Sequence, residues 1–165
     1  MAEPKIGVGT DPDAPGITVN GQDVAGPIRS RETSNSVSTV AAIPQVRTLL
    51  IGMQRHIIAA AAAGPGIVAE GRDIGTVVAP DATIKFYLTA SEDVRAQRRS
   101  ADLAADPAAT VEATRREQAR RDHRDAAQLV MADDAVEVDT SLLGLDEVVG
   151  LVVERARAQR AVRSG

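Results

Sequence analysis

The sequence contains no cysteine and no tryptophan, and its only aromatic residues are Phe86 and Tyr87. The absence of cysteine excludes disulfides, thiolate nucleophiles and cysteine-ligated metal sites, and it is typical of a reducing compartment. The scarcity of aromatic side chains excludes a stacking platform for the bases of a nucleic acid polymer. Aliphatic side chains must therefore fill the core.

Histidine is almost as scarce, since only His56 and His123 occur. A histidine-rich metal site is not expected, and a histidine-dependent catalytic triad would have to use one of these two residues. His123 lies among acidic residues, but a single imidazole there is more often a polar surface residue than a metal ligand. We therefore predict no metal site built by this chain.

Long hydrophobic runs and a secretion signal are also missing. The most apolar window, 49–63, is interrupted by polar residues and is shorter than the roughly 20 residues that cross a bilayer. We expect no membrane partner and a cytoplasmic location.

The chain is rich in arginine, in spite of its net charge of −4 over 165 residues. Lysine occurs only at Lys5 and Lys85, so 17 of the 19 basic residues are arginine. A guanidinium group can hold a phosphate or a carboxylate through two parallel hydrogen bonds. Each arginine cluster is therefore a candidate anion site.

Hydrophobic periodicity predicts strands that alternate with helices. The first thirty residues are predicted to form turns around a short strand. Ser91 is the expected N-cap of the helix that begins there. This alternation predicts an α/β fold with a parallel sheet between helices and a ligand beyond the carboxyl ends of the strands. The expected helices are 34–43, 46–61, 91–99, 110–125 and 145–156, and the expected later strands are 66–73, 83–90 and 134–140.

The most informative motif is E-G-R-D-I-G-T-V-V at 70–78, after the apolar run 67–69. Gly71 and Gly75 permit positive φ, so Arg72 and Asp73 could project from a tight loop into a cleft. The alternative is a surface turn in which the two charges pair with their neighbours.

Two further segments have similar ambiguity. Ser38 and Arg47 lie on either side of Pro44 and could converge on one polar ligand, or they could decorate a helix cap and a solvated face. The run R-R-D-H-R-D at 120–125 is either an exposed charged helix face or a clamp for phosphate and ribose that includes Asp125. The same alternatives hold for Arg95, Arg98 and Arg99.

The order of several motifs resembles that of the bacterial cytidylate kinase family over nearly the whole chain. The motifs are N-G-Q-D-V, A-A-I-P-Q-V-R, E-G-R-D-I-G-T-V-V followed by P-D-A, F-Y-L-T-A-S, R-R-D-H-R-D and D-A-V-E-V-D-T-S. The resemblance implies a P-loop nucleoside monophosphate kinase fold with a core, a nucleotide-binding insert and a lid. It also implies transfer of phosphate from ATP, with Mg²⁺, to CMP or dCMP.

The resemblance assigns roles to individual residues. Residues that read the cytosine base would be Ser38, Arg47 and Asp73, while Arg72 would hold the CMP phosphate. Arg121 and Asp125 would contact the sugar, and Arg95, Arg98 and Arg99 would lie where the lid begins. The implied segments are 1–33 from the CMP-binding insert, 34–90 from the core, 91–130 from the lid and 131–165 from the closing strand and helix.

Two departures from the family pattern affect the expected activity. No G-x-x-x-x-G-K-[ST] motif occurs, so the first strand and the ATP-binding loop are expected to be missing and no catalytic residue is assigned. In addition, no arginine lies between Asp125 and the last strand. We expect a carboxyl-terminal portion with little kinase activity alone. The alternatives are a non-catalytic cytidine-nucleotide-binding remnant and half of a split kinase that needs a separate amino-terminal fragment.

Overall fold

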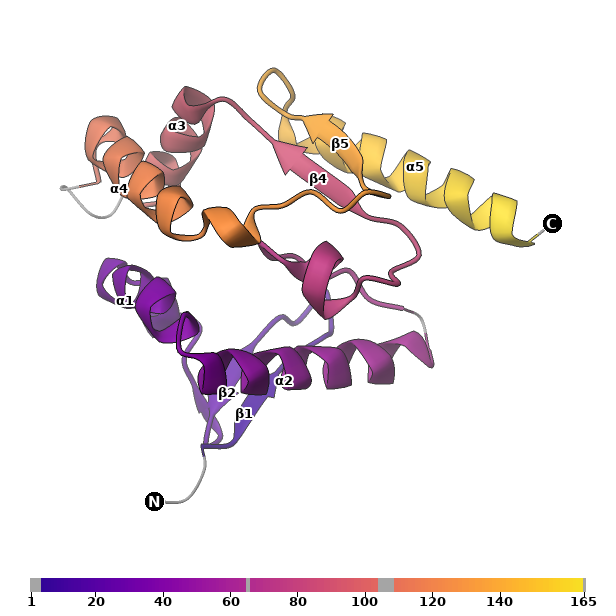
Figure 1. The fold of residues 1–165 in the computed structure, drawn as a ribbon, viewed down its shortest axis with the longest axis horizontal. Helices are drawn as coiled ribbons and strands as arrows, with labels where there is room; N and C mark the ends of the chain where they lie inside the picture. The colour runs from indigo at the N-terminus through magenta and orange to yellow at the C-terminus, as the bar shows by residue number, and fades with distance from the viewer. Residues whose placement is uncertain (1–3, 65, 104–108, 165) are drawn as a thin grey trace. The chain divides into compact units, whose positions relative to one another are not determined.

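The computed structural model describes residues 4–64, 66–103 and 109–164, although the side chains at 31, 35, 38, 127 and 162–164 lie outside the description. The expected break at Asp106 and Pro107 also lies outside the described residues. The chain divides into two compact units, an amino-terminal unit over residues 1–70 and a carboxyl-terminal unit over residues 71–165 (Figure 1).

The amino-terminal unit begins with an antiparallel sheet of three short strands, β1 (Ile6–Val8), β2 (Ile17–Val19) and β3 (Gln22–Asp23). Val19 pairs with Gln22, so Asn20 and Gly21 form a two-residue turn. Both turn residues have positive φ, 53° and 82°, as the favoured hairpin turn requires. This sheet confirms the short strand expected among the turns and adds two partners to it.

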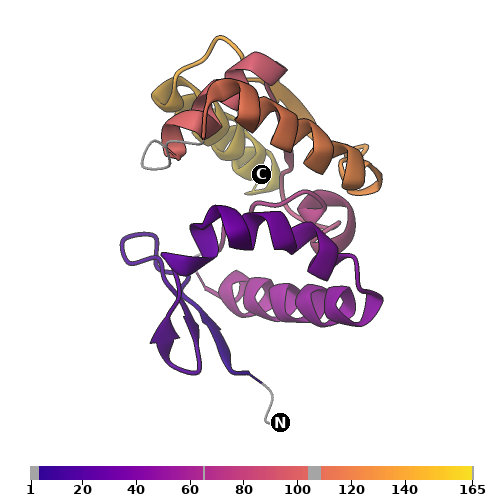
Figure 2. The ribbon, with the colours of Figure 1, turned by 90° about the vertical axis from the view of Figure 1, so that its left-hand side faces the viewer.

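A short helical turn, η1 (Pro27–Arg29), leads into two helices, α1 (Arg31–Ala41) and α2 (Pro44–Ala62), which Figure 2 shows with the strands of the same unit. Pro44 occupies the first turn of α2, where its missing N–H costs nothing, and Ile43 before it is extended. The predicted break at Pro44 is confirmed. None of the described helices is long and apolar enough to span a membrane alone, and the segments Glu32–Ala41 and Pro44–Ala62 pass that test only as a pair bent by 100°.

The strand expected at 66–73 is absent, which corrects the prediction. Gly66 has φ of +94°, and residues 67–73 pair with no other strand in the described part of the chain. Val68 is 96% exposed, so this apolar run does not enter a core. Hydrophobicity alone predicted a strand, but a strand also requires a neighbour for its backbone hydrogen bonds.

The carboxyl-terminal unit contains two parallel strands, β4 (Phe86–Thr89) and β5 (Val136–Asp139), whose arrows point the same way in Figure 1. Phe86 pairs with Val136, and Thr89 pairs with Asp139. At the carboxyl end, the amide and the hydroxyl of Thr140 both donate to the carbonyl of Thr89, at 2.8 and 2.9 Å. These strands confirm the parallel sheet and the two segments from which it was predicted.

Helices follow each strand of this unit, as the α/β pattern predicted. They are α3 (Glu92–Asp102) and α4 (Val111–Arg124) after β4, and α5 (Leu145–Ser164) after β5. The Ser91 side chain accepts a hydrogen bond from the amide of Val94, which confirms the predicted cap, and Thr110 caps α4 in the same way. Small side chains fill the described core, which includes Ala96, Val78 and Val138.

Lysine 85 connects the start of β4 to the segment before β5. Its side chain is 7% exposed, and its Nζ donates to both carboxylate oxygens of Asp134, at 2.7 and 2.9 Å, and to the carbonyl of Pro80. A Cβ on Gly75 would lie 3.4 Å from the Lys85 side chain. The buried ammonium is therefore neutralised by a partner on the neighbouring segment.

Candidate functional site

Arg72 lies in a loop at the beginning of the carboxyl-terminal unit, directly before the helical segment η2 (Ile74–Val78). The loop contains two glycines, but neither Gly71 nor Gly75 has positive φ. The prediction that these glycines adopt a left-handed backbone conformation is therefore wrong. At Gly71 a Cβ would lie 2.8 Å from the side chain of Ile74. Absence of a side chain, rather than a left-handed backbone, therefore lets the loop fold back beside Arg72.

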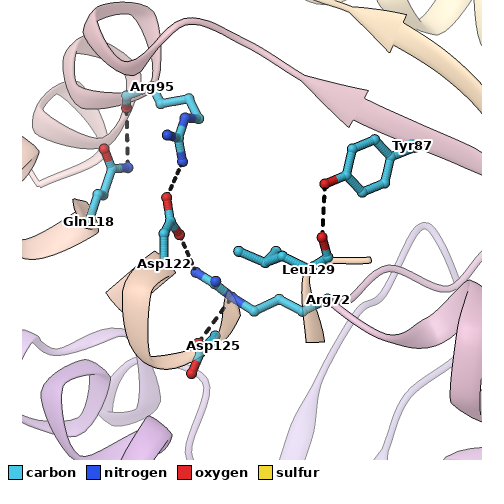
Figure 3. A network of polar contacts seen from close by, with 7 residues as sticks. All are labelled: Arg72, Tyr87, Arg95, Gln118, Asp122, Asp125 and Leu129. Carbon is cyan, nitrogen blue, oxygen red and sulfur yellow. Dashed lines mark hydrogen bonds and ion pairs between the residues drawn. The ribbon is translucent and has the colours of Figure 1, made fainter. Parts of the chain in front are cut away.

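The Arg72 guanidinium contacts two aspartates from the end of α4 (Figure 3). Its Nη2 lies 3.1 Å from Oδ1 of Asp122, and its Nε lies 3.3 Å from Oδ2 of Asp125. Residues three apart share one face of a helix, so both carboxylates point toward the same cation. Of the two alternatives for R-R-D-H-R-D, the structure therefore excludes a wholly solvated face.

Asp122, on α4, was missed by the sequence-based prediction, which named only Asp125, the residue directly after α4. Its second oxygen, Oδ2, lies 2.5 Å from Nη1 of Arg95 on α3. The side-chain amide of Gln118 also donates to the backbone carbonyl of Arg95, at 3.3 Å, so α3 and α4 are joined twice near this residue. The three-residue spacing from Asp125 was the one available signal for Asp122.

Arg121 lies in the same surroundings. Its burial lowers the pKa of its guanidinium, and Arg72 and Arg99 nearby lower that pKa further, whereas Asp125 and Asp122 raise it. We call this group of four arginines and two aspartates the arginine cluster; its members are Arg72, Arg95, Arg99, Arg121, Asp122 and Asp125. The cluster carries more positive than negative charge and so favours an anion.

Two nitrogen atoms of the arginine cluster lack a partner. Nη1 of Arg72 and Nε of Arg121 are buried and form no hydrogen bond within the described part of the chain. A buried donor without an acceptor is costly, so such atoms are ordinarily satisfied by a protein group, an ordered water or a bound ligand. The cluster therefore offers donors as well as positive charge.

Arg98 is placed differently from the other two arginines expected in the lid. Its Nη1 donates to the Thr140 hydroxyl at 2.9 Å, and its Nη2 donates to the carbonyls of Thr140 and Leu143 at 2.8 and 3.0 Å. These bonds hold the loop between β5 and α5 against α3. The lid assignment of Arg95, Arg98 and Arg99 stays a prediction, with a structural role now established for Arg98.

The residues expected to read the base belong to different units. Arg47 is half-buried on α2 of the amino-terminal unit, and the side chain of Ser38 on α1 lies outside the description. Asp73 belongs to the carboxyl-terminal unit and directly precedes η2, where its backbone carbonyl accepts from the amide of Val77 at 2.8 Å. Their convergence on one ligand stays a prediction.

Mg²⁺ and ATP are the further ligands that the family resemblance implies. Within residues 4–64, 66–103 and 109–164, no group of three or more histidine, aspartate or glutamate side chains could hold a metal ion. Asp122 and Asp125, the two carboxylates of the arginine cluster, are already paired with arginine. The donor set of the arginine cluster therefore suits an anion rather than a bare metal ion.

Comparison with known proteins identifies the source of these features. The family model described as "Cytidylate kinase" matches residues 3–158. A cytidylate kinase from Streptomyces griseus subsp. griseus is 51% identical over 160 residues, which cover 96% of this chain and 68% of that protein. The one from Streptomyces avermitilis is 50% identical over 98% of this chain and 69% of its own length, and that from Mycobacterium avium is 43% identical over 94% and 71%. The chain belongs to the cytidylate kinase family.

Proposed function

We propose that the chain binds CMP or dCMP as the phosphate acceptor of a nucleoside monophosphate kinase, with the arginine cluster holding the phosphate and the sugar. One observation carries this proposal: Arg72 is fixed by two aspartates and still has a buried Nη1 without a partner. A monophosphate supplies both the negative charge and the acceptor oxygens that this nitrogen lacks.

The charge balance supports a phosphate rather than a single carboxylate. A phosphate monoester carries about −1.5 to −2 charges near pH 7. The four arginines of the cluster exceed its two aspartates, and the lowered pKa of Arg121 reflects burial beside other cations. A doubly charged ligand would relieve this repulsion.

The sugar is assigned to Arg121 and Asp125, the pair that the family resemblance implies. Oδ2 of Asp125 lies 3.3 Å from Nε of Arg72, so a sugar bound at Asp125 would lie close to a phosphate bound at Arg72. The sugar and the phosphate of one nucleotide are likewise adjacent. For the base we propose Ser38, Arg47 and Asp73, because a carboxylate and a hydroxyl are suitable partners for the amino edge of cytosine. Location in the cytoplasm also stays a prediction.

In the family reaction, ATP and CMP give ADP and CDP. An oxygen of the CMP phosphate forms a bond to the γ-phosphorus of ATP as the bond to the β-phosphate oxygen breaks. The chain's own contribution would be to orient the acceptor and to neutralise its charge, which are the main protein roles in phosphoryl transfer. Within the described part of the chain, no group of three or more histidine, aspartate or glutamate side chains could hold Mg²⁺, so the roles proposed for these residues concern the acceptor alone.

Binding without turnover is the second candidate function for these 165 residues taken by themselves. The observation that favours it is the absence of G-x-x-x-x-G-K-[ST], whose amides and lysine hold the triphosphate in P-loop kinases. A separately supplied segment with this motif would then restore transfer, as the split-kinase alternative requires.

Calorimetric titration of the 165-residue chain with CMP, dCMP and UMP tests the proposal, and an ADP-coupled assay with Mg-ATP tests turnover. We expect CMP and dCMP to bind more tightly than UMP, and Asp73→Asn to reduce that preference. Equal affinity for all three nucleotides, or no binding, would contradict the proposed substrate. Enzyme-like conversion of CMP to CDP by this chain alone would contradict binding without turnover.

A further inference from the structure

We infer that Asp122 is a positioning residue for the phosphate acceptor: it holds Arg72 with one carboxylate oxygen and Arg95 with the other, and so fixes the phosphate-binding arginine before the nucleotide arrives. The inference rests on the proposed function and assigns a role that the sequence motifs did not indicate. It rests on the two contacts of Asp122, on the weak backbone support of Arg72 and on the contrast between Asp122 and Asp125.

The two contacts join three separate elements. Oδ1 of Asp122 lies 3.1 Å from Arg72 Nη2 in the loop before η2, and Oδ2 lies 2.5 Å from Arg95 Nη1 on α3, while Asp122 itself is on α4 (Figure 3). The contact with Arg72 is an ion pair, and the contact with Arg95 is both an ion pair and a hydrogen bond between charged groups. Asp122 is therefore the bridge between Arg72 and Arg95.

Arg72 needs such an anchor because its own backbone provides little support. The residues before it, 66–71, form no helix or strand, and an arginine side chain has several rotatable bonds. A guanidinium held beforehand loses less freedom when a phosphate binds, so the affinity for that phosphate rises. The position of Nη1, the buried nitrogen without a partner, is set by the contacts at Nη2 and Nε.

The two aspartates differ in a way that separates positioning from substrate contact. Within the described part of the chain, Asp125 forms an ion pair with Arg72 alone, through one oxygen, which leaves its other oxygen for the sugar. Asp122 uses each oxygen for a different arginine. Its position therefore indicates that it acts on the ligand through Arg72.

The substitution Asp122→Asn tests this role because an amide has a single acceptor oxygen and places two N–H donors opposite one of the arginines. The matched control is Asp93→Asn. Asp93 forms a 2.7 Å ion pair with Arg115 that also joins α3 to α4, but it lies outside the arginine cluster. Thermal unfolding of both variants identifies any general loss of structure.

The first readout uses the ligand-free chain and therefore does not depend on the proposed function. NMR order parameters of the arginine Nε–H groups, assigned with Arg72→Lys and Arg95→Lys, report side-chain motion on the picosecond to nanosecond scale. We expect Asp122→Asn to lower the order of both Arg72 and Arg95, and Asp93→Asn to change neither. Unchanged order of Arg72 in Asp122→Asn would overturn the inference.

The second readout is the dissociation constant of cytidine divided by that of CMP. This ratio isolates the contribution of the phosphate to affinity. Asp122→Asn should reduce this ratio by about tenfold, which corresponds to one lost hydrogen-bonding arrangement, while cytidine affinity stays the same. An unchanged or increased ratio would overturn the inference, because Asp122 would then be neutral or would compete with the phosphate. A wild-type chain with no preference for CMP over cytidine would instead contradict the proposed function, and the order parameters would still decide whether Asp122 holds Arg72.

Discussion

Asp125 is the more deeply buried of the two aspartates that contact Arg72, with 12% of its side chain exposed against 24% for Asp122, and its Oδ2 lies 3.3 Å from Nε of Arg72. A carboxylate that is largely removed from water is stable only when paired, and the same is true of the guanidinium beside it. This pair therefore serves folding as well as the proposed binding of a nucleotide.

The substitution Asp125→Asn should lower the free energy of unfolding by about 1–3 kcal/mol, because it leaves Arg72 and Arg121 with less compensation for their charge. Urea unfolding followed by circular dichroism measures the change. The exposed Asp133→Asn is a suitable control, since it removes one negative charge from the same unit. Equal stability of the two variants would show that the Asp125 pair does not support the fold.

Arg98 should be needed for the loop between β5 and α5, since its guanidinium donates to the hydroxyl and carbonyl of Thr140 and to the carbonyl of Leu143. We expect Arg98→Ala to lower the free energy of unfolding by about 1–3 kcal/mol. Arg98→Lys should recover only part of this loss, because an ammonium cannot reproduce the fork.

Hydrogen exchange at the amides of Thr140 and Leu143 locates the effect of Arg98. Both amides are hydrogen-bonded, to the carbonyls of Thr89 and Thr140 respectively, and they should exchange faster in Arg98→Ala. Unaltered exchange at these two amides would argue against Arg98 as the support of this loop.

Acid should weaken the fold through Asp134. Hydrogen bonding from Lys85 holds the pKa of Asp134 below its usual value, so the folded chain takes up the proton less readily than the unfolded chain. The stabilisation is therefore present above the ordinary aspartate pKa of about 3.9 and is lost as the pH falls below it.

Denaturant unfolding of the wild type and of Asp134→Asn at a series of pH values tests this dependence. The wild type should be the more stable protein at neutral pH, and the difference should shrink as the pH falls through the acid range. A difference that stays constant down to the lowest pH would show that ionised Asp134 does not stabilise the fold.

Local chemistry made much of the fold predictable. The break at Pro44 and the cap at Ser91, which the sequence predicted, each depend on residues within a few positions of one another. The Asn20–Gly21 turn and the cap at Thr110, which were not predicted, are equally local. The strand expected at 66–73 failed because the sequence does not reveal whether a neighbouring strand exists to pair with it.

The candidate site was predictable only in part, for a similar reason. Motifs indicated Arg72, Arg121 and Asp125, but the function of Asp122 arises from contacts with two residues distant in sequence. The bonds from Arg98 to Thr140 and Leu143 are equally non-local. The periodicity of a charged helix does not specify which partners its charges meet.

The central claim is that Arg72 binds the phosphate of the nucleotide. Calorimetric titration of the wild type and of Arg72→Ala with CMP and with cytidine tests it most directly, because the two ligands differ only in the phosphate. We predict a loss of CMP affinity of about 10- to 100-fold in Arg72→Ala, with cytidine affinity unchanged. An equal loss for both ligands, or no loss for CMP, would contradict the claim.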